Sequence, residues 1–389
     1  MSAKHEIESR LRAIGAPKDG EFTKHESLTS QWDKSLKKFS DQIEQYYIEN
    51  RQINGVQYEM KAVVPFGSSA SGLGMTGGDL DMIVCVHPPL GKKAGRLVKR
   101  RCNDILEVIF KKIQCGDMLK TRKLEEMEHI DGARVPIITG KVDGVDLDIS
   151  ISMTYTVSAQ YLASKFIDAY EKYDRRFILL AAFVKAWQKS KKTDQNEDYF
   201  RTVFPNSCST VLLVVFFMKH YKLLPNINKK HWAELSDARA TWPRVRQGEN
   251  GSFGIPRQYL ANWNTCDVSV GTLFFLFIDF YANIMDFKNY RMVIEDGSLR
   301  RKGKRRTHRV VIEDVIDSDN PAKSVTEEGM FVNWLKKAIT IVKSTEAEGI
   351  FDELMKDKLR DIMSYTKQEV NELRQRGLHA APWPPVKRY

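Results

Sequence analysis

Two acidic residues separated by a single position follow a loop rich in glycine and serine. The loop runs from Pro65 to Gly78 and leads directly into Asp79 and Asp81. Residues two apart on a strand share a face, so we expect these two carboxylates to project together. The glycines allow backbone N–H groups to approach a phosphate, and the Ser68 hydroxyl adds a donor. This combination suits metal-dependent phosphoryl transfer.

A further acid is expected from a hairpin downstream. The pair Asp143-Gly144 lies between two apolar runs and predicts a two-residue turn, which places Asp146 and Asp148 on one face of the returning strand. Each pattern alone is commonplace, because glycine-rich loops are usually plain connections and a lone Asp-x-Asp is usually solvated. Occurring in this order, they favour a site for two metal ions.

These residues resemble the nucleotidyltransferase superfamily typified by DNA polymerase β, whose pattern is Gly-Ser followed by Asp-x-Asp. Within it, the chain is similar to terminal uridylyltransferases and cytoplasmic-type poly(A) polymerases, which extend RNA 3′ ends without a template. The likeness is sharp from Val63 to Ile151. It reappears at residues 184–189, 206–209, 269–272 and 312–314.

The resemblance implies an α/β nucleotidyltransferase palm, a small mixed sheet flanked by helices, joined to a mostly helical poly(A)-polymerase-associated domain in two lobes with a cleft. We expect residues 1–54 to form a helical region that packs on the second lobe, and residues 55–153 to form the palm. Residues 154–376 would form the mainly helical domain, and residues 377–389 a tail. Apolar residues at helical spacing predict helices at 30–49, 94–113, 177–189, 207–221, 268–285, 328–343 and 350–374.

The family pattern also implies roles for the acids and the loop. Asp79 and Asp81 would bridge both metals, while Asp148 would hold the metal that activates the RNA 3′ hydroxyl. Asp146 is the alternative third acid. Gly67 and Ser68 would grip the β and γ phosphates of the nucleotide.

Two lysines on one helix would neutralise more of the triphosphate charge. Lys185 and Lys189 are spaced i and i+4 and therefore share a face. Without the resemblance this spacing would indicate a solvated basic stripe. Relatives place phosphate-binding lysines at both positions, and Trp187 between them is expected to pack in the core.

The base pocket departs from the family pattern. Relatives place Ser-Tyr at the start of the next helix, where the tyrosine stacks on the base, but this chain has Ser207-Cys208, and cysteine has no π face. Ser207 would serve as a phosphate donor or as a helix cap. Asp314 and Asp317 fall at acidic positions that face uracil in relatives, and Asp319 or Asn320 replaces a histidine. Near the ribose, Ser152 and Met153 replace two asparagines.

Charge and composition suit a polyanionic partner. The chain has 389 residues, a net charge of +11 and a pI near 9.2. A basic stretch between two apolar runs would contact RNA, with a nuclear localisation signal and a solvated loop as alternatives. Its candidate RNA-binding residues are Arg300, Arg301, Lys302, Lys304, Arg305 and Arg306. Five cysteines without Cys-x-x-Cys spacing indicate a reducing compartment and no structural zinc.

The N-terminus has no apolar signal core, and we expect a cytoplasmic or nuclear protein without a membrane partner. The expected activity is template-independent addition of nucleotides to RNA 3′ hydroxyl ends with Mg²⁺ or Mn²⁺. UTP is favoured narrowly over ATP as the substrate, and a poly(A) polymerase or a relaxed-specificity tailing enzyme is the runner-up. Two competing hypotheses are a cyclic-dinucleotide or oligonucleotide synthase and an inactive RNA-binding scaffold. Single-stranded RNA is the expected partner, and a protein adaptor would select it.

Overall fold

The chain divides into two units in a computed structural model. Unit 1 comprises Met1–Tyr46, Leu179–Asn226 and Trp263–Tyr389, and unit 2 comprises Tyr47–Ile178 and Ile227–Asn262. The structure describes residues 3–14, 26–50, 63–75, 78–85, 95–119, 121–132, 135–152, 164, 167, 170–171, 173–193, 197–226, 266–303, 309–314 and 320–356. The predicted palm, residues 55–153, falls inside unit 2.

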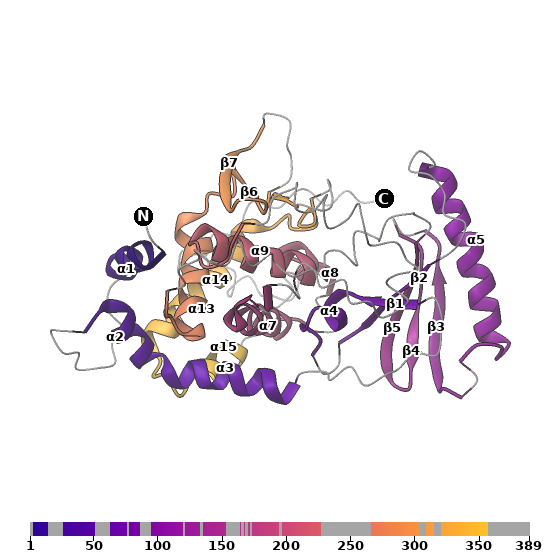
Figure 1. The fold of residues 1–389 in the computed structure, drawn as a ribbon, viewed down its shortest axis with the longest axis horizontal. Helices are drawn as coiled ribbons and strands as arrows, with labels where there is room; N and C mark the ends of the chain where they lie inside the picture. The colour runs from indigo at the N-terminus through magenta and orange to yellow at the C-terminus, as the bar shows by residue number, and fades with distance from the viewer. Residues whose placement is uncertain are drawn as a thin grey trace, which may run out of the picture. The chain divides into compact units, whose positions relative to one another are not determined.

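Unit 2 is built around a five-stranded mixed sheet (Figure 1). Its strands lie in the order β1-β2-β5-β4-β3, where only β2 and β5 are parallel and every other neighbouring pair is antiparallel. Their bounds are β1 (Val63–Phe66), β2 (Leu80–Cys85), β3 (Leu124–Ile130), β4 (Ile137–Val142) and β5 (Val145–Ser152). The mixed sheet expected from the sequence is confirmed.

One long helix covers the sheet. α5 (Gly95–Gln114) contacts β3, β4 and β5, and Figure 1 shows it running beside these strands. Leu106 and Ile113 of α5 are buried against Ile138 and Leu147 of the sheet. Since these residues recur at helical spacing on α5 and alternate on the strands, the apolar pattern of the sequence produces this two-layer core.

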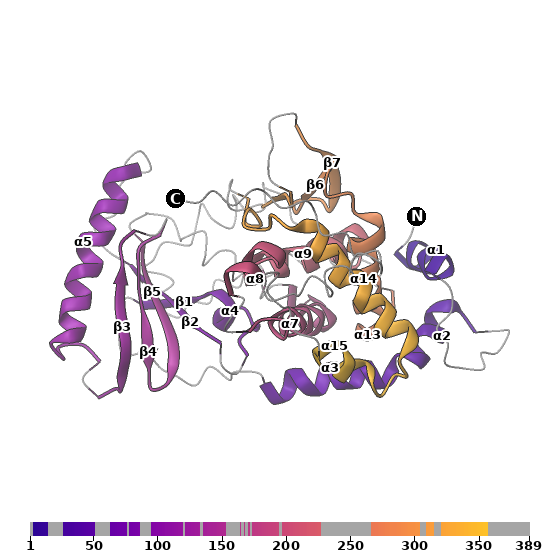
Figure 2. The same ribbon diagram turned by 180° about the vertical axis from the view of Figure 1, so that it is seen from behind.

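Unit 1 is predominantly helical. Figure 2 shows α14 beside α13, in agreement with their contacts. α3 and α7 each run across the boundary between the units. The helices of unit 1 and these two are α1 (Ala3–Ile14), α2 (Leu28–Ser35), α3 (Lys37–Asn50), α7 (Arg175–Lys189), α8 (Glu197–Val203), α9 (Ser207–His220), α13 (Val270–Asp279), the π-helix η1 (Phe280–Ile284), α14 (Glu328–Ser344) and α15 (Ile350–Lys356).

The helix predicted over residues 30–49 is interrupted at Leu36, where α2 ends and α3 begins. The Ser40 hydroxyl donates to the Leu36 carbonyl at 2.9 Å and accepts the Gly271 N–H of α13 at 3.0 Å. A Cβ on Gly271 would lie 2.6 Å from that hydroxyl. α13 thus approaches the chain closely beside this interruption, and a one-dimensional pattern does not contain that contact.

The centre of unit 1 is lined by aromatic rings. Phe183 of α7 makes edge-to-face contacts with Phe39 of α3 and Phe274 of α13. The segment from Glu197 to His220 is long and apolar enough to cross a membrane by length and composition alone. In its most apolar window 67% of the residues are buried inside the protein, which is the environment of a core helix.

A second, three-stranded sheet belongs to unit 1. Its order is β7-β6-β8, formed by β6 (Tyr290–Val293), β7 (Ser298–Arg301) and β8 (Ile312–Glu313), and β8 pairs with β6 in parallel. The sequence led us to expect a basic turn from Arg300 to Arg309. Arg300 and Arg301 instead lie on β7, because the turn occurs earlier, at Asp296 and Gly297, where Gly297 has a φ of +69°.

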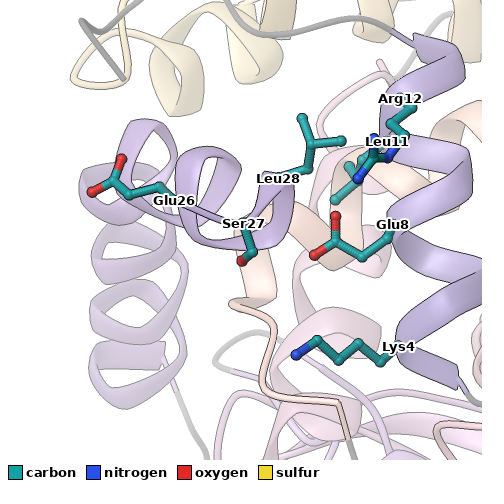
Figure 3. Close-up of a pocket in the computed structure, with 7 residues that line it drawn as sticks. All are labelled: Lys4, Glu8, Leu11, Arg12, Glu26, Ser27 and Leu28. Carbon is teal, nitrogen blue, oxygen red and sulfur yellow. The ribbon is translucent and has the colours of Figure 1, made fainter. Parts of the chain in front are cut away.

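An open pocket lies between α1 and α2 (Figure 3). Figure 3 shows side chains of both charges on α1 and the acidic Glu26 just before α2. The described lining residues are Lys4, Glu8, Leu11, Arg12, Glu26, Ser27 and Leu28, and none of them is a predicted site residue. The candidate site therefore lies elsewhere.

Candidate active site

Asp81 and Asp148 are register partners on the two parallel strands of the palm sheet. One carboxylate oxygen each from Asp79, Asp81 and Asp148 lies within 4.8 Å of the others. Asp79 immediately precedes β2 and is exposed, while Asp81 and Asp148 are half-buried. The structure thus brings together the three acids predicted from the sequence, and the parallel pairing of β2 with β5 is what aligns them.

The hairpin that delivers the third acid has the predicted turn. Asp143 and Gly144 have φ values of +53° and +80°, and the flanking residues Val142 and Val145 are register partners. Positive φ at both central residues defines the turn type that fits the twist of a two-residue hairpin. Asp146, the alternative third acid, is exposed and lies outside the cluster, so Asp148 is the acid that joins Asp79 and Asp81.

The Gly-Ser segment forms a single helical turn, α4 (Gly67–Ala70), directly after β1. Gly67 has a φ of +68°, and a Cβ on it would lie 2.0 Å from Oδ2 of Asp81. The Gly67 N–H donates to the buried Ser164 hydroxyl at 2.7 Å. The Gly67 N–H is thus bonded within the protein, and the Ser68 side chain beside it is half-buried.

Two more side chains fix the far end of this turn. The Tyr47 hydroxyl donates to the Gly72 carbonyl at 2.9 Å. A Cβ on Gly72, whose φ is +75°, would lie 2.2 Å from a carboxylate oxygen of Glu171. The sequence indicates Tyr47 only as a core residue and does not reveal Ser164 or Glu171, because no local pattern links them to the loop.

The three aspartates fit a divalent metal centre. Carboxylate oxygens are hard ligands, which Mg²⁺ and Mn²⁺ prefer, and three of them converge here. Gly67 leaves the space that Asp81 fills, so the backbone itself is shaped around a ligand side chain. The Ser150 hydroxyl of β5 donates to the Met82 carbonyl of β2 at 3.3 Å, which braces the two strands just beyond the residues that carry the acids.

The predicted phosphate-binding lysines lie on α7. Lys185 is half-buried and Lys189 is exposed, and both side chains interact with other residues. Trp187 between them is 1% exposed and packs edge-to-face against Phe204 and Phe274. Trp187 is therefore a core residue, as expected.

The start of α9 corrects one expectation. Ser207 is a candidate helix cap in the sequence, but the cap is Asn206, whose side chain accepts the Ser209 N–H at 2.9 Å. Ser207 and Cys208 are both exposed on the first turn. The asparagine preceding the helix is itself a capping signal that could have been read from the sequence.

The segment after β8 is described in part. Asp314 is half-buried, whereas Asp317 and Asp319 lie outside the described residues, as does Met153. Asn320 is the alternative base-reading residue. Its side-chain oxygen accepts the N–H groups of Ile312 and Ala322, at 3.0 and 3.2 Å, and its nitrogen donates to Val310. The Asn320 side-chain amide therefore binds backbone groups through both its oxygen and its nitrogen.

The structure describes some of the candidate RNA-binding residues, and the others lie outside the described residues. Arg300 pairs with Asp296 at 2.8 Å. The Lys302 ammonium donates to the carbonyls of Phe287 and Arg309. Arg301 is exposed, and among the described residues it has no ion pair. Lys304, Arg305 and Arg306 lie outside the described residues.

Comparisons with known proteins agree with this site. Residues 21–172 match the sequence model of the central palm domain of the mitochondrial-like poly(A) RNA polymerases. Poly(A) RNA polymerase, mitochondrial, of Drosophila melanogaster is 27% identical over 250 residues, which are 60% of this chain and 39% of that protein. The chain thus spans about two fifths of the length of the curated relative that it matches.

Solved structures share the fold at low identity. A crystal structure of mtPAP in complex with ATPγS has a TM-score of 0.62 at 16% identity, covering 90% of this chain and 74% of that one. A cytoplasmic RNA terminal U-transferase has a TM-score of 0.57 at 18% identity, covering 82% and 99%. Residues 21–172 thus match a poly(A) RNA polymerase palm domain, and the chain shares the fold of these nucleotidyltransferases, with three aspartates converging on the palm sheet.

Proposed function

We propose that the chain transfers nucleotides from nucleoside triphosphates to the 3′ hydroxyl of RNA without a template, releasing pyrophosphate. The single observation that carries this proposal is the cluster of Asp79, Asp81 and Asp148, whose ligand oxygens lie within 4.8 Å of one another on paired strands. The named activities of the relatives, poly(A) RNA polymerase and RNA terminal U-transferase, support the same reaction class.

Asp79 and Asp81 would bridge two divalent cations, and Asp148 would hold the one beside the RNA 3′ end. Two such cations, when bound, supply activation of the attacking hydroxyl and neutralisation of charge on the leaving oxygen. The half-buried positions of Asp81 and Asp148 in adjacent strands hold these carboxylates in place before the substrate arrives.

The triphosphate would be bound by neutral and positively charged donors. The Ser68 hydroxyl follows Gly67, which has little freedom because Ser164 holds its N–H. On α7, Lys185 and Lys189 would add positive charge for the β and γ phosphates. Ser207 would donate its hydroxyl, which is exposed on the first turn of α9 and which the capping bond of Asn206 leaves available.

Base choice is the finer part of the proposal. The sequence favours UTP narrowly over ATP, but the relatives include both a poly(A) polymerase and a U-transferase, so we propose that either triphosphate is used. Cys208 occupies the stacking position, and Asp314, with Asp317 and Asp319, would line the base edge. The missing aromatic ring supports relaxed discrimination between bases.

The exposed Arg301 and the basic residues beyond it would contact the RNA backbone. Substrate choice would come from a protein adaptor, since we recognise no separate RNA-binding module in the sequence. A reducing compartment, cytoplasmic or nuclear, remains our proposal for where the protein acts.

A transfer assay tests the proposal directly. The full chain is incubated with an end-labelled single-stranded RNA and each nucleoside triphosphate in turn, with Mg²⁺ or Mn²⁺, beside an Asp79→Ala, Asp81→Ala double variant. Stepwise lengthening by the wild type alone supports transfer, and the most efficient triphosphate identifies the base. RNA that is bound but never lengthened would instead favour the inactive scaffold.

A further inference from the structure

Asn206 joins two elements that carry proposed nucleotide-binding residues. Its side-chain oxygen accepts the Ser209 N–H at 2.9 Å and so caps α9. Its side-chain nitrogen donates to the Pro321 carbonyl at 3.0 Å, across 115 positions of sequence. One amide therefore binds both the first turn of α9 and the described segment that begins at Asn320.

The neighbouring Asn320 joins this segment to β8. Asn320 binds the Ile312 N–H at the start of β8 and the Val310 carbonyl just before that strand. Val310 and Ile312 are 0% and 1% exposed, so the residues that Asn320 binds belong to the core. Asp314 directly follows β8, so its backbone is attached to a strand whose position is fixed.

The segment that begins at Asn320 is also bound farther along. The N–H groups of Thr326 and Glu327 both donate to the Thr202 carbonyl near the end of α8, at 2.9 and 3.0 Å. Asn206 stands between α8 and α9 and binds the same segment at Pro321. The position of Asp314 relative to Ser207 and Cys208 therefore depends on a chain of contacts in which Asn206 is the side-chain link.

We propose that Asn206 is a positioning residue for nucleotide selection, which through Pro321 and Asn320 holds Asp314 in register with the first turn of α9. This inference rests on the proposed function, because it assigns those two elements to the nucleotide pocket. Groups that bind one ligand from separate elements must be held to a fraction of an ångström, and the loss of a link between them weakens binding and discrimination together.

The two bonds of Asn206 can be separated chemically. Asn206→Ser retains a side-chain oxygen suited to the cap position but has no amide to reach Pro321, and it adds no charge. Asn206→Asp retains the capping oxygen in an isosteric side chain and also lacks the amide donor. If both variants change nucleotide binding in the same way, the added negative charge of Asp is excluded as the cause.

A matched control lies in the other unit. Asn103 of α5 likewise donates its side-chain amide to a backbone carbonyl, that of Asp131 at 3.4 Å. Asn103→Ser and Asn103→Asp therefore make the same chemical changes away from α9.

The test measures KM and kcat for ATP, UTP, CTP and GTP, together with the Tm and the hydrogen exchange of residues 309–323. We expect both Asn206 variants to raise the KM for the preferred triphosphate about ten- to a hundredfold and to reduce discrimination between bases. The Tm should remain near that of the wild type, and amides around Ile312 and Ala322 should exchange faster. The Asn103 variants should leave all of these values unchanged.

The outcomes distinguish the two claims. Absence of transfer by the wild type with every triphosphate overturns the proposed function. An active wild type whose Asn206 variants keep the same KM and base discrimination overturns the positioning role alone. A fall in Tm with equal loss of activity for all four triphosphates would reduce Asn206 to a structural cap, and this also contradicts the inference.

Discussion

The backbone of Gly67 lies so close to the Asp81 carboxylate that a Cβ on residue 67 would be 2.0 Å from Oδ2 of Asp81. The φ of +68° at Gly67 also belongs to the region that favours glycine. Two requirements, space and backbone conformation, thus meet at the residue that follows the first strand and begins the Gly-Ser turn. The catalytic proposal depends on both.

Gly67→Ala should displace Asp81 from the cluster. The added methyl group cannot share space with the carboxylate, so we expect transfer activity to fall about a hundredfold or more, the effect of misplacing a reacting group by about an ångström. The matched control is Gly116→Ala, where φ is +69° but nothing lies within 4 Å of the new Cβ. Equal activity of the two variants would show that contact with Asp81 does not set the requirement for glycine.

Cys208→Tyr should restore stacking on the incoming base. Cys208 is exposed on the first turn of α9, so a larger side chain can be accommodated there. Stacking is worth about 1–3 kcal/mol per base, which predicts a KM for the nucleotide lower by about five- to a hundredfold. Steady-state kinetics with each triphosphate measure this, with Cys115→Tyr, at another exposed cysteine, as the control. An unchanged KM would place the base away from residue 208.

The N-terminal helix is held by an ion pair between the half-buried Arg10 and the buried Asp279. Arg10 of α1 donates through Nε to Asp279 at 2.6 Å, and Asp279 is 2% exposed. Arg10→Ala leaves that carboxylate buried without its cation, for which a loss of about 3–5 kcal/mol in the free energy of unfolding is expected. Chemical denaturation measures the loss. Arg12→Ala, at an exposed residue of the same helix, should change stability little.

Lys219 of α9 should make stability depend on pH. Burial lowers the pKa of Lys219 from 10.5 to about 7, against the opposing effect of Asp296 and Glu295. The ammonium donates to the Ile294 carbonyl at 2.7 Å, and the residue is 3% exposed. Between these two pKa values the unfolded chain binds more protons than the folded one, so stability should rise as the pH rises from 7 towards 10.

The expected gain between pH 7 and pH 9 is about 2 kcal/mol for one such group. Urea denaturation at both pH values measures it in the wild type and in Lys219→Met, which has no group to titrate there. The variant should lose the gain whatever its absolute stability. The same rise in both proteins would assign the pH dependence to other groups.

Local patterns predicted the elements that carry the acids. The Asp143-Gly144 turn set the register of β4 with β5, and alternation placed Asp148 on the face of the acidic cluster. The parallel pairing of β2 with β5 was not predicted, because a strand pattern does not state its neighbour. The apolar spacing also predicted the buried face of residues 32–47. Its members, each at most 3% exposed, are Trp32, Leu36, Phe39, Ile43 and Tyr47.

Contacts between distant positions were not predictable. Ser164 holds the Gly67 N–H, and Asn206 holds Pro321, yet in the sequence each is an ordinary polar residue. The Ser40 hydroxyl, one turn after Leu36, binds the Gly271 N–H across 231 positions. Arg300 and Arg301 lie on β7, paired with β6, although the basic stretch from Arg300 to Arg309 was expected to form a turn. In each case the deciding atom comes from another part of the fold.

The central claim is that Asp148 joins Asp79 and Asp81 in one metal-dependent site. The most direct test compares Asp148→Asn with Asp146→Asn, two identical changes two residues apart on β5, one inside and one outside the cluster. The readout is lengthening of labelled RNA with Mn²⁺ and the preferred triphosphate. We predict that Asp148→Asn lowers the rate about a hundredfold or more while Asp146→Asn retains wild-type activity. Full activity of Asp148→Asn, or equal loss in both variants, would contradict the account.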